Sequence, residues 1–366
     1  MAMSEKLFKR ITLVFAILIA LLGGEFVLRL IRPERLDVAR YEDIYDQTYS
    51  PSKGGMVVSL KPNIVRRRWG TEVKTNSYGE RDFEYTLKKE KGVYRIAVIG
   101  DSVAFGYGIS LKDTFAKILE KKLNENSEKK YEVLLFGRPG YSISNVYYSY
   151  LDKIKNFEPD MIIYAMVLND FEKSFKDETT QNEEKKKSGS LLKTLKIANR
   201  NLFSFFRRHS AIYNLLIDFS FKLLTKTRMV DINEARALEC FYPESEKFKI
   251  EWKNTQKWLL LLRDLFGDEK KEFLVCLFPY QFQIDNEMVS FLRDKGVDIP
   301  YGDLLLIQKK IVEFANSNKI NIIDLAEVYK KSNPKNLYIK NDYGHPNKLG
   351  NEIAATEILK YLKNNE

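Results

Sequence analysis

Histidine and cysteine are nearly absent from this sequence. Its 366 residues include only two histidines, His209 and His345, and two cysteines, Cys240 and Cys276. A closed zinc site built from these residue types would need all four, and their spacing matches no such site, so we expect no metal centre. Two isolated cysteines are more typical of core thiols than of a disulfide.

A strong excess of one charge is also missing. Lys and Arg number 60 and Asp and Glu 50, which gives a net charge of +10. The basic residues are interspersed with acidic ones and no motif for nucleic-acid binding accompanies them, which indicates a solvated lysine-rich surface. With 44% hydrophobic residues the chain can bury a large core, which excludes disordered, collagen-like and disulfide-scaffold proteins.

Long apolar runs are absent beyond the N-terminus. Residues 11–24 are uncharged and apolar, and continuing to Ile31 gives a helix of about 20 residues, enough to cross a bilayer. No small-x-small cleavage site follows, which favours an uncleaved signal anchor over a cleaved signal peptide. A buried N-terminal helix of a soluble protein is the third interpretation. We therefore expect residues 1–35 to form a short tail and one transmembrane helix.

The basic residues Lys6, Lys9 and Arg10 precede the apolar run. They predict a cytoplasmic tail, although arginines on the far side of the run weaken the asymmetry. The expected protein crosses the cell membrane once and has its larger part outside the cytoplasm.

Beyond residue 93, short apolar runs of strand type alternate with segments of helical periodicity. This pattern predicts an α/β fold, a three-layer α/β/α sandwich around a mostly parallel sheet. Ligands of such sheets bind at the carboxyl ends of the strands. The predicted strands are residues 95–99, 131–136, 160–167, 272–278 and 320–323, and the predicted helices are residues 114–124, 144–155 and 348–362.

Residues 36–92 precede this α/β domain, which we expect to span residues 93–366. They are rich in Pro, Gly and Tyr without a helical signal, and we interpret them as a juxtamembrane brace. An insertion at about 171–240 starts with a charged polar loop and continues into a basic helical region at 191–229. That region is either a lid or membrane-facing surface, or an extra helical layer on the core.

A serine follows the first predicted strand directly, in Gly100-Asp101-Ser102. At that place its hydroxyl and its amide face the functional edge of the sheet, which suits a nucleophile whose own N–H helps to stabilise an oxyanion. A phosphate-binding loop is the competing interpretation, but the glycine spacing of such loops is absent.

Glycine and asparagine follow the next two strands. The second strand leads into a turn that contains Arg138 and ends at Gly140, and the third leads to Asn169. By themselves these residues are typical of turns. Arg138 would either contact an anionic substrate or face solvent, and we expect it to face solvent.

A carboxylate lies three residues before the second histidine. Asp342 and His345 precede Pro346 and the last predicted helix. Asp342 can accept a hydrogen bond from Nδ1 of the imidazole, which fixes the tautomer whose Nε2 is free to act as a base. A purely structural histidine is the alternative.

The four blocks occur in one order and together resemble those of the SGNH hydrolase family, the GDSL-type esterases and lipases. The resemblance implies that Ser102 is the nucleophile, His345 the general base and then acid, and Asp342 the orienting carboxylate. It also implies an oxyanion hole formed by the Ser102 amide, the Gly140 amide and the Asn169 side chain, with no cofactor. One departure is Val167, because the family commonly has glycine two positions before the asparagine.

The implied function is that of a membrane-anchored serine esterase, which cleaves an O-acyl group, such as O-acetyl, from a glycan, lipid or small molecule. An O-acyltransferase that modifies cell-envelope polysaccharide would use the same residues, because hydrolysis and transfer share the acylation step. A membrane-tethered binding module that keeps the fold without activity is a further alternative.

Overall fold

A computed structural model of the chain describes residues 5–31, 44–46, 59–68, 70–125, 127–171, 210–213, 215–216, 242–294, 299–340, 342 and 344–365. The chain divides into two compact units. The smaller unit comprises Met1–Asp43 and Lys176–Thr227, and the larger unit comprises Ile44–Phe175 and Arg228–Glu366. The sequence-based boundaries near residues 35 and 92 stay predictions.

The smaller unit contains the helix α1, Glu5–Ile31. Within it, Ile11–Ile31 is long and apolar enough to cross a membrane, and none of that segment is buried. A signal sequence has the same properties. The Glu25 carboxylate accepts hydrogen bonds from Arg29 Nε at 2.9 Å, from Ser210 Oγ at 3.0 Å and from the Ala211 amide at 2.8 Å. These contacts connect the helix to the insertion.

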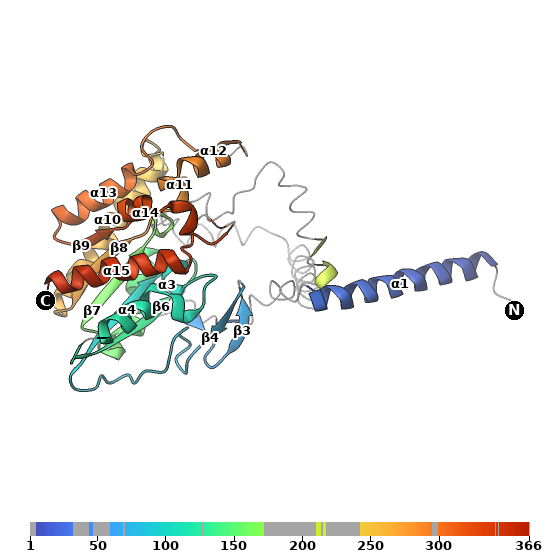
Figure 1. The fold of residues 1–366 in the computed structure, drawn as a ribbon, viewed down its shortest axis with the longest axis horizontal. Helices are drawn as coiled ribbons and strands as arrows, with labels where there is room; N and C mark the ends of the chain where they lie inside the picture. Colours follow the sequence, from blue (N-terminus) through green and yellow to red (C-terminus); the bar gives the residue numbers. More distant parts are fainter. Residues whose placement is uncertain are drawn as a thin grey trace, which may run out of the picture. The chain divides into compact units, whose positions relative to one another are not determined.

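A five-stranded sheet in the order β6-β5-β7-β8-β9 is the centre of the larger unit, and every neighbouring pair is parallel (Figure 1). The central strands are buried on both faces, which explains why their sequences are apolar apart from Arg95 near the start of β5. The strands are β5 Val93–Gly100, β6 Lys130–Gly137, β7 Met161–Met166, β8 Glu272–Leu277 and β9 Asn321–Asp324.

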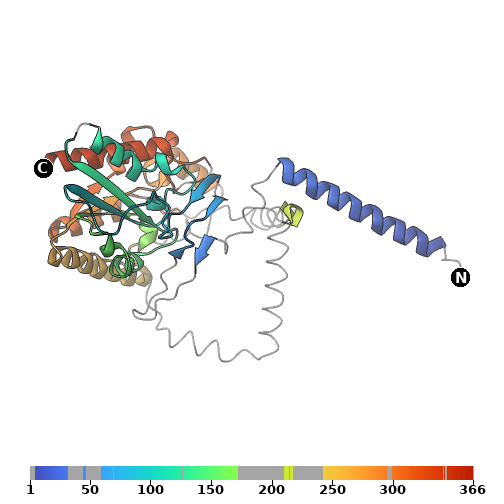
Figure 2. The same ribbon diagram turned by 90° about the horizontal axis from the view of Figure 1, so that it is seen from below.

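Helices cover both faces of the sheet (Figure 2). One face carries α4 and α15, which pack against each other, and the other carries α5 and α10. The helices that follow β5 and its neighbours are α3 Ser102–Phe105, η3 Leu111–Asp113, α4 Phe115–Asn124, α5 Ile143–Asp152, η4 Ile154–Phe157 and η5 Leu168–Asp170. The later helices are α10 Glu246–Asp268, α11 Gln281–Ile284, α12 Asn286–Asp294, α13 Leu306–Ser317, α14 Ala326–Lys331, η6 Pro334–Asn336 and α15 Lys348–Asn365.

Short antiparallel strands precede the sheet in the larger unit. They are β1 Tyr45–Asp46, β2 Ser59–Leu60, β3 Val65–Arg68 and β4 Thr71–Lys74, with β1 paired to β2 and β3 paired to β4. A small separate core joins them to the helix α3. It consists of Ile44, Leu60, Val73 and Phe105. The residues before the sheet therefore pack on the element that begins with Ser102.

The predicted α/β fold is confirmed, with a parallel sheet between two helical layers. Each predicted strand overlaps an observed one, and the three predicted helices correspond to α4, α5 and α15. The 23-residue helix α10 and the helix α13 were not among the predicted elements. Most of the insertion at 171–240 lies outside the described residues, so its alternatives stay open.

One of the two cysteines can be placed. Cys276 lies in β8 as a buried free thiol, and burial raises its pKa. This fits the expected core thiol. Cys240 and His209 lie outside the described residues.

Candidate active site

Ser102 begins the four-residue helix α3 directly after β5. The turn into α3 is tight, because a Cβ at Gly100 would lie 2.6 Å from the Ala165 carbonyl oxygen and one at Gly137 would lie 2.1 Å from the Phe105 nitrogen. Glycine at both positions lets β7, α3 and the end of β6 approach closely. The chain therefore presents the Ser102 side chain at the carboxyl edge of the sheet.

Ser102, His345 and Asp342 form one chain of hydrogen bonds. His345 Nε2 lies 2.8 Å from Ser102 Oγ, and His345 Nδ1 lies 2.8 Å and 2.7 Å from the two carboxylate oxygens of Asp342. Because an ionised carboxylate only accepts, Nδ1 donates to Asp342 and Nε2 accepts the Ser102 hydroxyl proton. The three residues come from positions up to 243 residues apart, which only the folded sheet brings together.

The pKa of Asp342 is lowered. Burial by itself would raise it, but the hydrogen bond and charge of the His345 ring and the backbone N–H groups of Gly344 and His345 outweigh burial. Those two N–H groups each lie 3.1 Å from Asp342 Oδ1. Asp342 therefore stays ionised at neutral pH, as the orientation of His345 requires.

Two residues beside the hydrogen bonds of Ser102, His345 and Asp342 were not predicted as site residues. Asp101 is buried, its Oδ2 lies 3.0 Å from Ser102 Oγ and its Oδ1 accepts from the Val103 amide at 2.8 Å. Burial raises the pKa of Asp101, while the Val103 N–H, His345 and Ser102 oppose that shift. Because the hydroxyl hydrogen points to one acceptor at a time, Asp101 competes with His345 for it.

Tyr107 is the second such neighbour. Its ring stacks on the His345 ring, with centroids 4.3 Å apart and an angle of 21° between the planes. The sequence signal for this contact is slight, since Tyr107 lies between two glycines in a loop. Stacking fixes the plane of the imidazole from the side that faces neither Ser102 nor Asp342.

The two other residues of the expected oxyanion hole lie at the same edge of the sheet, outside the hydrogen-bonded chain. Gly140 ends the turn after β6 with a positive φ of 82°, and Asn169 lies in η5 after β7. Since β6 and β7 flank β5, Gly140 lies on one side of Ser102 and Asn169 on the other. The Asn169 Oδ1 atom is buried, and no described residue donates a hydrogen bond to it.

Arg138 does not face solvent, so that expectation was wrong. The side chain is buried, pairs with Glu80 at 2.5 Å and donates to the carbonyls of Gly137 at 2.9 Å and Gly79 at 3.0 Å. Its partner lies 58 residues earlier in the chain, in a segment that local sequence patterns do not connect to this turn. Residues that precede the sheet, Gly79 and Glu80, therefore bind the turn that ends at Gly140 through Arg138.

Within the described residues, no group of three or more His, Cys, Asp or Glu side chains could hold a metal ion. The arrangement found is a serine hydroxyl hydrogen-bonded to a histidine ring whose other nitrogen contacts a carboxylate, with Gly140 and Asn169 at the same edge of the sheet. Such a group of residues can perform acyl transfer through a covalent serine intermediate.

Similar solved structures are esterases and lipases at low sequence identity. An acetyl xylan esterase, AlAXEase, is 15% identical with a TM-score of 0.41, and the match covers 73% of this chain and 98% of that one. A lipase/acylhydrolase from Enterococcus faecalis is 11% identical with a TM-score of 0.42 and coverages of 74% and 96%. A catalytic mutant of an acetylxylan esterase from Geobacillus stearothermophilus is 12% identical with a TM-score of 0.40, and the match covers 73% of this chain and 93% of that one.

A protein-family model matches residues 84–233, which is less than half of the chain. No curated protein matches the sequence.

Proposed function

We propose that this protein is a serine esterase that hydrolyses an O-acyl ester through an acyl-enzyme on Ser102. The observation that carries the proposal is the hydrogen-bonded chain from Ser102 Oγ through the His345 ring to Asp342, with distances of 2.8 Å and 2.7 Å. These are the distances at which a general base can take the proton of a nucleophile.

In the first half-reaction, Ser102 Oγ attacks the ester carbonyl carbon while its proton passes to His345 Nε2. Asp342 accepts from Nδ1 and stabilises the imidazolium that forms. The negative charge on the former carbonyl oxygen is stabilised by the Ser102 and Gly140 amides and by the Asn169 side chain. When the C–O bond to the alcohol breaks, His345 Nε2 returns the proton to the leaving oxygen, and the acyl group stays on Ser102.

In the second half-reaction a water molecule attacks the acyl-enzyme. His345 takes one of its protons, the acid leaves, and the proton returns to Ser102 Oγ. A sugar hydroxyl in place of water would give acyl transfer with the same residues, so the acceptor decides between hydrolysis and transferase activity.

The substrate ester is proposed to lie outside the cytoplasm. Supporting this are the apolar segment Ile11–Ile31 and the basic residues Lys6, Lys9 and Arg10 before it. Protease added to intact spheroplasts should digest a C-terminal tag without permeabilisation. Protection of the tag until the membrane is opened would contradict this orientation.

Full-length protein in detergent tests the esterase proposal with p-nitrophenyl acetate and a fluorophosphonate. We expect hydrolysis, and a mass shift on the peptide that contains Ser102. Ser102→Ala should lower kcat by on the order of 10⁴-fold or more. The control is Ser290→Ala, which removes an exposed hydroxyl on α12 that donates to Asn286 at 3.2 Å. Equal rates in Ser102→Ala and the parent would refute the proposal.

An acylated product on an added oligosaccharide, measured by mass spectrometry, would reveal transferase activity. Release of free acid alone would support hydrolysis.

A further inference from the structure

Two adjacent buried charges follow the β3–β4 hairpin and reach the active-site loops. Glu80 and Arg81 are only 3% and 1% exposed, although they belong to a segment without regular structure at 75–82. Asn76 shapes this segment, because its Oδ1 accepts from the amides of Tyr78 at 3.0 Å and Glu80 at 2.9 Å. The segment is thus folded so that the side chains of two consecutive residues, Glu80 and Arg81, are both buried.

Arg81 holds the loop that follows α3. Its guanidinium donates to the carbonyls of Phe105 at 2.8 Å, Gly106 at 2.7 Å and Ile109 at 2.6 Å, and more weakly to Glu72 at 3.2 Å. Among the described residues no carboxylate pairs with it. Burial lowers the pKa of Arg81 to about 10, so the side chain remains charged at neutral pH. Carbonyl oxygens and the Phe105 ring, 5.0 Å away, balance that charge.

The loop that Arg81 holds carries two contacts of the proposed catalytic residues. The Tyr107 amide donates to the Ser102 carbonyl at 3.0 Å, and the Tyr107 ring stacks on His345. Arg81 therefore fixes, through three carbonyls, the short helix that begins with Ser102 and the ring that covers His345. A single point charge such as Lys could not reach the same carbonyls in this forked geometry.

Glu80 holds the other loop. Its carboxylate pairs with Arg138 Nη2 at 2.5 Å and with Lys153 Nζ. Arg138 lies in the turn that ends at Gly140, and its own amide donates to the Gly100 carbonyl at 3.0 Å. Glu80 thus reaches, through Arg138, the turn that carries a proposed oxyanion donor.

We propose that Glu80 and Arg81 are positioning residues for the reaction, with Arg81 fixing the Ser102 and Tyr107 loop and Glu80 fixing the Gly140 turn through Arg138. This inference rests on the proposed esterase function. It assigns to the segment before the sheet a role in catalysis that is separate from holding the domain together. An error of about 1 Å in placing reacting groups can lower a rate by about 10²-fold.

The test compares conservative variants of the full-length protein, Arg81→Lys and Glu80→Gln, with the parent enzyme. We expect kcat for p-nitrophenyl acetate and the rate of fluorophosphonate labelling to fall by about 10- to 100-fold in each, with KM unchanged within about twofold. The double variant Glu80→Gln/Arg138→Gln should lose no more kcat than the single variant with the lower kcat, because both changes remove the same ion pair.

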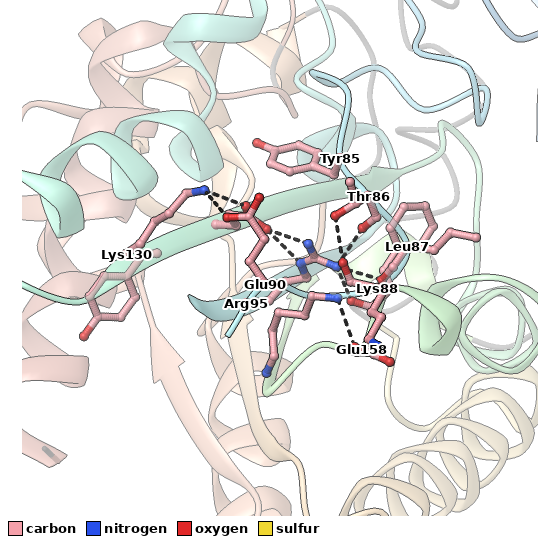
Figure 3. A network of polar contacts seen from close by, with 12 residues as sticks. Tyr85, Thr86, Leu87, Lys88, Glu90, Arg95, Lys130 and Glu158 are labelled. Carbon is pink, nitrogen blue, oxygen red and sulfur yellow. Dashed lines mark hydrogen bonds and ion pairs between the residues drawn. The ribbon is translucent and has the colours of Figure 1, made fainter. Parts of the chain in front are cut away.

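The control is Arg95→Lys at the opposite end of the sheet. Arg95 is equally buried and donates to the carbonyls of Thr86 at 2.9 Å and Leu87 at 3.0 Å (Figure 3). It also donates to the Phe157 carbonyl at 2.6 Å. This variant should lower the melting temperature as Arg81→Lys does, but leave kcat of the folded enzyme unchanged.

A second readout does not depend on activity. Because the chain has only two histidines, ¹⁵N-histidine labelling gives two imidazole spin systems, and His209→Gln assigns them. Arg81→Lys should shift the His345 ring signals, since Tyr107 stacks on that ring, and Arg95→Lys should not.

The outcomes separate the two proposals. If Ser102→Ala is inactive while Arg81→Lys and Glu80→Gln keep the parent kcat, the positioning role is refuted and the esterase stands. If the parent itself is inactive, the esterase proposal fails, and unmoved His345 signals in Arg81→Lys would refute the positioning role too. Should Arg81→Lys not fold, the near-isosteric Glu80→Gln decides.

Discussion

Both ends of the parallel sheet bury an arginine, but the two arginines have different kinds of partner. At the amino end, Arg95 of β5 pairs with Glu132 of the neighbouring strand β6 at 2.7 Å and donates to carbonyls of two loops (Figure 3). At the carboxyl end, Arg81 comes from outside the sheet, and its contacts with the described residues are backbone carbonyls and the Phe105 ring. Within the part of the chain that the structure describes, a carboxylate pairs with the Arg95 guanidinium and none pairs with that of Arg81.

This difference relates to what each end of the sheet does. Glu132 and Arg95 lie on adjacent strands whose register is already fixed by backbone hydrogen bonds, so their pair reinforces an existing contact. The carboxyl end consists of loops, which have no such register. There a buried guanidinium provides several directed donors at once and can set the positions of separate loops.

The largest effect should come from Asp342→Asn at the carboxyl end. A carboxamide no longer enforces the tautomer with Nε2 free, so kcat should fall by on the order of 10³- to 10⁴-fold. Asn can still accept from the Gly344 and His345 amides, and the melting temperature should change little. Steady-state kinetics with calorimetry measure both. An unchanged kcat would mean that Ser102 and His345 act as a dyad. The charge of Asp342 would then have no role in the reaction at the carboxyl end of the sheet.

Arg95→Met at the amino end should affect stability instead. It removes the Arg95 donor from several carbonyls and from Glu132, which keeps Lys130 at 3.5 Å, and breaking a buried ion pair costs about 3–5 kcal/mol of unfolding free energy. Chemical denaturation measures this loss, while kcat of the folded fraction should remain within about twofold of the parent. The double variant Arg95→Met/Glu132→Leu should recover part of the loss. A kcat that falls as far as in Arg81→Lys would remove the functional difference between the two ends.

The smallest effect concerns Asp82, the next residue of the 75–82 segment. Burial raises its pKa from 3.8 to about 6, against the opposing charge of Lys117 at 2.7 Å. The folded state therefore binds this proton more tightly than the unfolded state does. The stabilisation is complete below about pH 4 and is lost as the pH rises through about 6.

Asp82→Asn removes this titration. The unfolding free energy of the variant minus that of the parent should rise by on the order of 1–3 kcal/mol between pH 4 and pH 7, measured by urea denaturation. A difference that falls with pH would mean that pairing with Lys117 outweighs burial. The kcat of the folded variant should equal that of the parent. Such a result would show that attachment of the 75–82 segment through Asp82 is distinct from the positioning role of Glu80 and Arg81.

Much of the fold could be predicted from local sequence patterns. The strands β5, β6, β7 and β8 each contain an apolar run, with charged residues such as Arg95 and Glu132 confined to the amino ends of the strands, because both faces of the runs are buried. The helix α10 was not predicted. It has only six buried residues along its 23, and its sequence contains charged and aromatic residues that mask the apolar stripe.

The site was predictable to the extent that it depends on neighbours in sequence. Asp342 and His345 are three residues apart and Ser102 follows a strand, so each could be suggested as a site residue, but only the resemblance to SGNH hydrolases implied that the three act together. The contacts of Arg81 with the loop after α3 join residues 24 to 28 positions apart, and the contact of Arg138 with Gly79 spans 59 positions. No periodicity or turn signal encodes such pairings, because they depend on how the segment 75–82 folds over two loops that are themselves irregular.

The small core around Phe105 has a practical consequence for producing this protein. Ile44, Leu60 and Val73 cover an aromatic ring that belongs to the same four-residue helix as Ser102. A recombinant fragment that starts at residue 93 would keep the entire sheet yet expose that ring and remove Arg81. Expression trials of a soluble form should therefore begin before Ile44, since the shorter fragment would retain the three residues of the hydrogen-bonded chain without the segment that supports them.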